Sequence, residues 1–311
     1  MALFGAGARI DGGLRVALKL SILYRGPLAS CNYGCDYCPF AKHAETAAEH
    51  AADARALQYF VGWVTGRRQD QLSILFTPWG EGLNRSRYQR ALIELTGLPQ
   101  VEKAAIQTNL SCRLDWVEAC DKRKLALWTT FHPTEVERAR FVAKCWELAQ
   151  RGVRFSVGAV GLKEHAAEIA ALRAELPPSA YLWINAYKRV PAYYDEALRQ
   201  QFTTIDPLFS LNEQPHPSQG RACRAGQSVI SVDGDGVIRR CHFISAPLGN
   251  IYEPGFEQAL QPRACSSATC GCHIGYVHLE DLKLYEVFGE GVLERIPQQA
   301  IWQPQVSTKG R

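Results

Sequence analysis

The chain has 311 residues, of which 47% are hydrophobic, and its formal net charge is +4. This size and composition fit one large domain, or a large domain with a small appendage, and so mild a charge argues against nucleic-acid binding. No apolar run approaches the ~20 residues of a membrane-spanning helix, and residues 1–13 lack the apolar centre of a secretory signal. We therefore expect a cytoplasmic protein with no membrane and no nucleic-acid partner. Its eleven cysteines are expected to bind metal or carry out redox chemistry rather than form disulfides.

Short apolar runs alternate with helical patterns along the first two thirds of the chain. The runs predict six strands, at residues 18–24, 72–76, 104–107, 125–130, 153–157 and 181–184. Between them, apolar residues spaced three and four apart predict helices. Six βα repeats indicate a parallel sheet wrapped by helices. Since six are too few to close an eight-stranded barrel, we expect a curved, partial (β/α)6 TIM-like barrel with its chemistry at the carboxyl ends of the strands.

The pattern changes after Tyr187. Residues 206–219 are rich in Pro, Ser and polar residues and predict a linker. Two β-type runs then flank the turn Asp233-Gly-Asp-Gly236 and predict a hairpin. We therefore expect a partial barrel at residues 14–205, a linker at 206–220, and a small cysteine-bearing domain with the C-terminal tail at 221–311.

The first cysteine group directly follows the first predicted strand, in the sequence Ser30-Cys31-Asn-Tyr-Gly-Cys35-Asp-Tyr-Cys38-Pro39. Three thiolates with CxxxCxxC spacing on one loop can hold three corners of a [4Fe–4S] cube. The fourth iron is then open to a small molecule. The competing interpretation is a zinc site, which usually has four ligands in CxxC pairs, and no fourth ligand is obvious nearby.

With the aromatic Tyr37 before its third cysteine, this motif resembles that of the radical S-adenosylmethionine superfamily. The resemblance extends along the whole predicted partial barrel. It implies that Cys31, Cys35 and Cys38 hold a catalytic [4Fe–4S] cluster whose open iron binds S-adenosylmethionine (AdoMet), with Tyr37 near the cofactor. It also implies an external electron donor such as flavodoxin or ferredoxin. About 17 residues precede the first predicted strand, too few for a fused leader-peptide-binding domain, and this counts against a peptide substrate, although such a domain can be a separate protein.

Residues at the ends of the other predicted strands extend the resemblance to the cofactor. Where the family has Gly-Gly-Glu after the second strand, this sequence has Trp79-Gly80-Glu81. The departure at Trp79 puts the first position in doubt, while the Gly80 backbone and the Glu81 carboxylate remain suited to the cofactor's ammonium group. The other strand-end residues expected near cofactor or substrate are Thr108, Asn109, Ser156, Asn185 and His132. Asn185 is expected to bond to ribose or adenine, and His132 to face substrate or act as an acid or base; alternatively, each is an ordinary turn residue.

The second cysteine group begins with Cys223, which is followed by twelve residues, Gly236, four residues and Cys241. This CX12GX4C pattern resembles the start of the auxiliary-cluster domains called SPASM or, in their shorter form, twitch. A full SPASM domain needs seven cysteines for two clusters, and only five are present here, so the resemblance implies one auxiliary [4Fe–4S] cluster. Its expected ligands are Cys223, Cys241, Cys270 and Cys272, with Cys265 as the alternative. Structural zinc at the same thiolates is the competing interpretation.

These resemblances together predict an oxidoreductase that cleaves AdoMet reductively and abstracts a hydrogen atom from its substrate. The expected outcome is net oxidation or crosslinking of a peptide side chain. Dehydrogenation of a small polar metabolite is the alternative, and a zinc- or cluster-bearing interaction module is the non-enzymatic one. The remaining cysteines, Cys112, Cys120 and Cys145, are expected to pack as small apolar residues.

Overall fold

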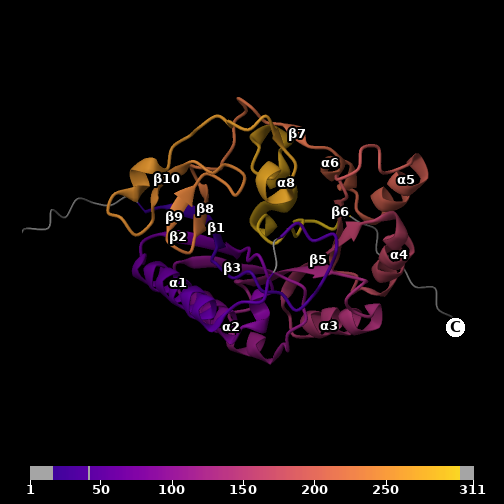
Figure 1. Ribbon diagram of the computed structural model, residues 1–311, viewed down its shortest axis with the longest axis horizontal. Helices are drawn as coiled ribbons and strands as arrows, with labels where there is room; N and C mark the ends of the chain where they lie inside the picture. The colour runs from indigo at the N-terminus through magenta and orange to yellow at the C-terminus, as the bar shows by residue number, and fades with distance from the viewer. Residues whose placement is uncertain (1–16, 41–42, 302–311) are drawn as a thin grey trace, which may run out of the picture.

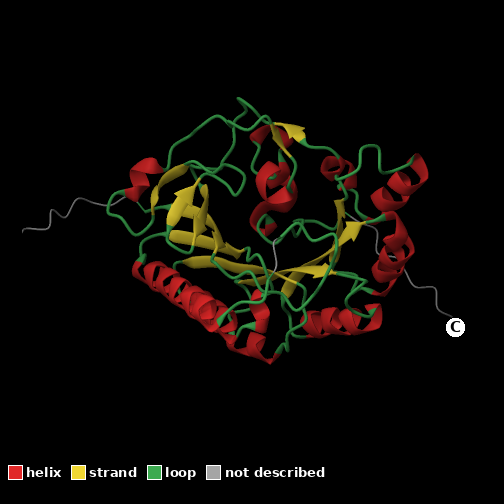
Figure 2. Cartoon of the chain, viewed as in Figure 1, coloured by secondary structure: helices red, strands yellow, loops and turns green. Residues whose placement is uncertain are grey.

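The computed structural model describes residues 17–40 and 43–301, which are built around a nine-stranded sheet (Figures 1 and 2). The strand order is β10-β9-β8-β1-β2-β3-β4-β5-β6. Strands β8 and β1 to β6 pair in parallel, whereas β9 and β10 continue the sheet in antiparallel fashion. The strands are β1 (Lys19–Arg25), β2 (Gln71–Phe76), β3 (Val101–Thr108), β4 (Leu125–Phe131), β5 (Arg154–Gly161), β6 (Tyr181–Ala186), β8 (Val229–Asp233), β9 (Val237–Arg239) and β10 (Pro247–Asn250). A separate two-stranded sheet pairs β7 (His216–Pro217) with β11 (Thr269–Cys270).

Helices cover the outer, convex face of the parallel strands, as Figure 2 shows. Outward-facing strand residues such as Ile22 and Ile74 form one buried apolar cluster with helix residues such as Phe60 and Leu92. The α-helices of the described residues are α1 (Ala47–Gly66), α2 (Ser86–Gly97), α3 (Arg138–Gln150), α4 (Ala166–Glu175), α5 (Glu196–Ile205), α6 (Phe209–Glu213), α7 (His273–Tyr276) and α8 (Leu284–Phe288). Of these, α7 and α8 pack on the inner face instead.

The inner face of the sheet is covered by the end of the chain. Because side chains alternate across a strand, Leu23, Leu75 and Trp183 point inward and form a second buried cluster with residues 274–293. Helix α8 accordingly lies inside the arc of strands in Figure 1. The Glu294 carboxylate pairs with Lys103 of β3 at 2.7 Å, so a buried ion pair also links the segment to the sheet.

The predicted α/β architecture with a mostly parallel sheet is confirmed, and all six predicted strands are present. The predicted hairpin is β8–β9, and β8 also extends the sheet by pairing with β1. The predicted linker at 206–220 is wrong as a description of this segment, which contains α6 and β7 and buries Asp206, Phe209 and Asn212. Asp206 accepts hydrogen bonds from the Tyr181 hydroxyl and the Ile184 amide, so its polar character serves the fold rather than solvent. Residues 14–16 and 302–311 of the predicted domains lie outside the described residues.

No helix in the described part of the chain is long and apolar enough to cross a bilayer.

Candidate functional site

The first cysteine group lies on the loop between β1 and α1, at the carboxyl edge of the parallel strands. Cys35 is buried, and Cys31 and Cys38 are half-buried. Polar groups surround the sulfurs: the Tyr33 amide lies 3.4 Å from Cys31 Sγ, and the Asn109 side-chain amide donates to the same sulfur at 3.9 Å. Donors of this kind are typical around thiolate ligands, because they stabilise negative charge on sulfur.

The Trp79-Gly80-Glu81 turn packs directly against this loop. The Glu81 amide donates to the Ser30 carbonyl at 3.0 Å, and the Trp79 amide donates to the Leu28 carbonyl at 3.2 Å. A Cβ at Gly80 would lie 1.8 Å from the Ser30 oxygen, so only glycine fits there. The turn after β2 therefore fixes the backbone that leads into Cys31.

Glu81 has a role that differs from the one expected from the sequence. Its carboxylate is 3% exposed and accepts hydrogen bonds from the Thr108 hydroxyl at 2.8 Å, the Asn109 amide at 2.6 Å and the Leu83 amide at 3.0 Å. Burial raises the pKa of Glu81, and these donors oppose the shift. With most of its acceptor positions used inside the protein, the carboxylate joins the ends of β2 and β3.

Thr108 and Asn109, expected near the cofactor, end β3 next to the cysteine loop. The Asn109 side-chain amide donates to the Asn32 oxygen at 3.1 Å as well as to Cys31. The next residue, Leu110, is buried and has φ = 58°, a left-handed conformation that is costly for a leucine. One strained backbone residue thus lies beside the point where β3 meets the cysteine loop.

His132, which follows β4, also belongs to this cluster. Its Nδ1 lies 3.4 Å from Cys35 Sγ and 3.0 Å from the Tyr37 hydroxyl. The rings of Tyr37 and His132 are stacked with centroids 5.8 Å apart, and Glu135 of the same loop accepts from the Gly34 amide at 3.0 Å. His132 therefore packs against the second half of the cysteine loop, through Cys35 and Tyr37.

Ser156, expected at the mouth of the sheet, lies elsewhere. Strand β5 continues to Gly161, so Ser156 is near its beginning. Its buried hydroxyl donates to the Glu294 carbonyl at 2.6 Å and accepts from the Trp183 indole at 3.2 Å. The expectation of a cofactor contact is therefore wrong, because this hydroxyl anchors the C-terminal segment.

Asn185, by contrast, is exposed on the inner face near the carboxyl end of β6. Strand alternation places Arg25, Gln107 and Thr130 on the same inner face at the ends of their strands, and all three are partly exposed. These accessible side chains lie closer to the carboxyl ends of the strands than the buried residues of the second cluster, which fill the rest of the inner face. The sequence analysis missed these three residues, although the inward alternation of Leu23, Ala105 and Trp128 would have located them.

The second cysteine group gathers segments far apart in the sequence. Cys270 lies within electrostatic range of Cys223, Cys241, Cys265 and Cys272. Burial raises the pKa of the Cys223 and Cys241 thiols, and that of Cys270 to about 12. These thiols are therefore protonated at neutral pH in the chain without metal, and a bound metal would have to displace the protons.

Arg240 organises part of this group. It is buried, lies electrostatically close to Cys223 and Cys241, and donates to the Arg263 carbonyl at 2.9 Å. It also donates to the Ala264 carbonyl, next to Cys265. Cys272 differs from Cys223 and Cys241 in its charged neighbours, which are Lys188, Arg295 and Arg25 rather than Arg240 and thiols. The structure thus favours neither Cys265 nor Cys272 as a ligand of the expected cluster, but Cys272 has different charged neighbours.

Both groups fit iron–sulfur ligation in their donor chemistry. No disulfide involves any of the eleven cysteines, all of which lie in the described residues. Within those residues, no three His, Cys, Asp or Glu side chains converge as ligands of one metal ion. The ligands of an iron–sulfur cube bind separate iron atoms at its corners. Three thiolates spread along one loop, with N–H groups near their sulfurs, therefore suit an iron–sulfur cluster better than a single metal ion.

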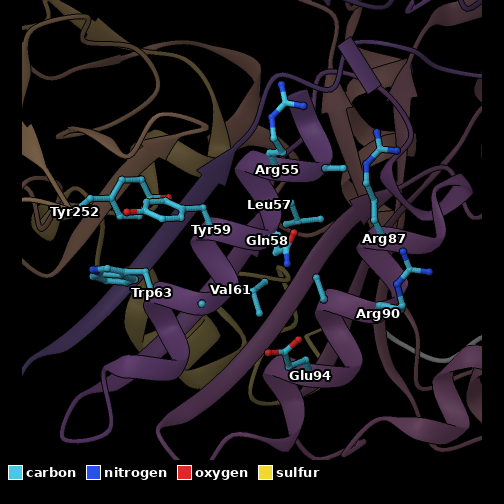
Figure 3. A pocket seen from close by; sticks show the side chains of 13 residues that line it. Arg55, Leu57, Gln58, Tyr59, Val61, Trp63, Arg87, Arg90, Glu94 and Tyr252 are labelled. Atoms are coloured by element: carbon cyan, nitrogen blue, oxygen red, sulfur yellow. The ribbon is translucent and has the colours of Figure 1, made fainter. Parts of the chain in front are cut away.

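Two surface pockets lie at different places relative to this chemistry. The larger, of about 1120 Å³, is outside the sheet between α1 and α2, lined by Arg55, Tyr59, Trp63 and Arg90 (Figure 3). The smaller, of about 170 Å³, adjoins the cysteine loop and includes Asn32 and Asn109 in its lining. Only the smaller pocket touches the candidate site.

Fold and site together define an α/β protein that gathers thiols at the carboxyl edge of a parallel sheet. The sequence matches no protein-family model and no curated protein. Among solved structures, native anSMEcpe with bound AdoMet and Kp18Cys peptide is 14% identical, with 78% of this chain and 81% of that chain covered and a TM-score of 0.52. Hexahistidine-tagged anSMEcpe with bound AdoMet is 15% identical, with 78% and 82% covered and a TM-score of 0.51. This chain therefore shares the fold of an AdoMet-bound protein, in agreement with the resemblance indicated by its motifs. BtrN in complex with AdoMet and 2-DOIA aligns over 79% of this chain and 88% of that chain at 15% identity, with a TM-score of 0.41.

Proposed function

We propose that this protein is a radical AdoMet enzyme built on a partial (β/α)6 barrel, with a [4Fe–4S] cluster held by Cys31, Cys35 and Cys38. The observation that carries this proposal is the CxxxCxxC loop at the carboxyl edge of the sheet, clamped by the ends of three neighbouring strands. The fold shared with AdoMet-bound anSMEcpe supports it.

The residues around the loop have separable tasks in this proposal. Gly80 lets the turn after β2 approach the loop, while Glu81 holds that turn to β3. Asn109 and His132 place polar N–H or ring nitrogen groups beside the sulfurs of Cys31 and Cys35 and so tune the charge there. When bound and reduced, the cluster supplies the electron that splits AdoMet into methionine and a 5′-deoxyadenosyl radical, which takes a hydrogen atom from substrate.

We further propose a peptide substrate and a net oxidation of one of its side chains. The peptide found with anSMEcpe supports the first point. The second cysteine group supports the net oxidation, since an auxiliary [4Fe–4S] cluster without an open iron is suited to accepting the electron left on a substrate radical. An external one-electron donor of the flavodoxin or ferredoxin type is required to reduce the first cluster.

The test replaces Cys31, Cys35 and Cys38 together by Ala in the anaerobically reconstituted protein. Wild type should contain about eight iron atoms per chain and form 5′-deoxyadenosine from AdoMet under dithionite, whereas the triple variant should lose about four irons and all of this activity. Cys145→Ala, on the buried face of α3, is the matched control and should behave as wild type. Formation of 5′-deoxyadenosine by the triple variant would rule out the assignment. A colourless wild-type protein with stoichiometric zinc would favour the interaction module instead.

A further inference from the structure

An exposed tryptophan stands where the sequence departs from the family pattern. Trp79 occupies the position of the first glycine of the family's Gly-Gly-Glu turn, and its side chain is 40% exposed. The turn that carries it is hydrogen-bonded through its backbone to the segment that leads into Cys31. The residues assigned to the proposed function do not include this indole, although it lies at the edge of the candidate site.

A cation covers one face of the indole. The guanidinium carbon of Arg25 lies 4.3 Å from the centroid of the Trp79 ring. Arg25 ends β1 on the inner face of the sheet, and its Nε donates to the Thr77 carbonyl at 2.8 Å. Burial lowers the pKa of Arg25 to about 10, so the group is still a cation at neutral pH. The indole therefore rests on a charged side chain of the inner face.

Phe40, which follows the third cysteine of the loop, lies beside the edge of the same indole. Its ring centroid is 5.1 Å from that of Trp79, with the ring planes at 79°. The Arg25 guanidinium carbon is 5.8 Å from the Phe40 centroid. Together with the 4.3 Å contact, these distances make a nearly right angle at the Trp79 ring. Neither group therefore covers the second face of the indole.

The support of this arrangement extends toward the second cysteine group. Thr77, which holds Arg25, is fully buried, and its hydroxyl lies 2.9 Å from Nε2 of His242. Nδ1 of the same imidazole lies 2.7 Å from the Ser231 hydroxyl of β8, and His242 directly follows Cys241. The indole is thus braced from both cysteine regions, so its orientation is fixed before a ligand binds.

We propose that Trp79 is a stacking platform for an aromatic side chain of the substrate. This inference rests on the proposed function and deepens it, since it names the class of side chain that the peptide presents at the mouth of the sheet. Aromatic rings stack on an indole face in an offset arrangement. The Arg25 cation attracts the π electrons of the indole toward its own side. The opposite face is therefore electron-poor and favours an electron-rich ring, such as a phenol, over a saturated ring of similar size.

The experiment titrates anaerobically reconstituted, AdoMet-saturated holoprotein by calorimetry with three blocked tripeptides. Acetyl-Gly-Tyr-Gly-amide carries a phenol, acetyl-Gly-cyclohexylalanine-Gly-amide a saturated ring, and acetyl-Gly-Ala-Gly-amide no ring. The tyrosine probe should bind about three- to tenfold more tightly than the cyclohexyl probe, and the alanine probe should bind more weakly than both. Equal binding of the tyrosine and cyclohexyl probes would overturn the platform, because burial of apolar area alone would then account for the binding.

Variants assign the preference to the indole. Trp79→Ala should remove the preference for the tyrosine probe, and Trp79→Phe should restore most of it. Arg25→Met keeps the length of the side chain without its charge and should reduce the preference. The matched control is Trp146→Ala, because Trp146 is 42% exposed on α3, outside the sheet, and it should bind the probes as wild type. An unchanged preference in Trp79→Ala would overturn the proposal.

Two further readouts separate this role from others. Trp79→Ala should retain the iron content and the AdoMet affinity of wild type. An equal loss of AdoMet affinity would assign the indole to the adenine ring of the cofactor, and a loss of iron would assign it to support of the cysteine loop. Either result would overturn the subsite. Failure of the proposed function is recognised separately, as a wild-type protein that forms no 5′-deoxyadenosine under dithionite.

Discussion

Replacing Gly80 by Ala tests how the turn after β2 supports the cysteine loop. The added Cβ would lie 1.8 Å from the Ser30 carbonyl oxygen, whereas real Cβ contacts are essentially never shorter than 3.0 Å. The turn and the loop must therefore separate by about 1 Å, and a displacement of that size can reduce a rate about 100-fold. The two backbone hydrogen bonds that join turn and loop would weaken, at about 0.5–1.5 kcal/mol each. Because the obstacle is backbone rather than a flexible side chain, it has little room to relax.

The assay compares Gly80→Ala with Gly62→Ala for iron content, AdoMet affinity and the initial rate of 5′-deoxyadenosine formation. Gly62 lies inside α1, and a Cβ there meets nothing within 4 Å. The control should therefore be active, and roughly 0.5–1 kcal/mol more stable because alanine is the better helix residue. We expect Gly80→Ala to lose most AdoMet cleavage. If it keeps wild-type iron, affinity and rate, the close packing of turn and loop does not support the site, and the reasoning is refuted.

Three further perturbations probe other parts of the structure. Glu81→Gln should lower the free energy of unfolding by about 1–3 kcal/mol, because the new NH2 group must face one of the present donors, such as the Asn109 amide. Urea denaturation measures this change, and unchanged stability would contradict the carboxylate's structural role. Burial, and to a lesser extent Arg224, lowers the pKa of His278 from 6.5 to about 3. The unfolded chain thus binds the extra proton, and stability falls as pH drops below about 6.5, by at most about 1.4 kcal/mol per pH unit. His278→Asn should reduce the pH dependence of the urea midpoint between pH 6.5 and 5, and the remainder comes from His242 and His273, whose pKa values burial also lowers. An unaltered slope would argue against a neutral buried imidazole at His278. The Cys223→Ala/Cys241→Ala variant should still form 5′-deoxyadenosine but no oxidised product, so full product formation or a redox-neutral product would make the second cluster structural.

The strand pattern was accessible from the sequence because each of the six strands contains a run of apolar residues. Strand β5 shows the limit of this signal. Its second half, Gly158-Ala-Val-Gly161, has little β propensity, so the sequence pattern ends the strand early and places Ser156 at its end. That second half carries the actual end of β5 away from the Ser156 hydroxyl.

The residues of the candidate site also differ in whether a local sequence pattern identifies them. The spacing of Cys31, Cys35 and Cys38 is local in sequence and was readily recognised. The inward-facing residues Arg25, Gln107 and Thr130 are isolated in sequence, and only the pairing of their strands brings them to one edge of the sheet. Glu81 lies in the turn after β2, but its hydrogen-bond partners depend on the end of β3, which no local pattern specifies.

The C-terminal segment that fills the inner face also affects how the protein is made. Strand β8 pairs with β1, which lies about two hundred residues earlier, and residues 274–293 cover apolar side chains from β1 to β6. During synthesis the six strands emerge with that face uncovered, so a nascent chain is exposed to aggregation until residues 274–293 have left the ribosome. Folding should therefore be slow for the chain's length, and a truncation before residue 274 should need a chaperone to remain in solution.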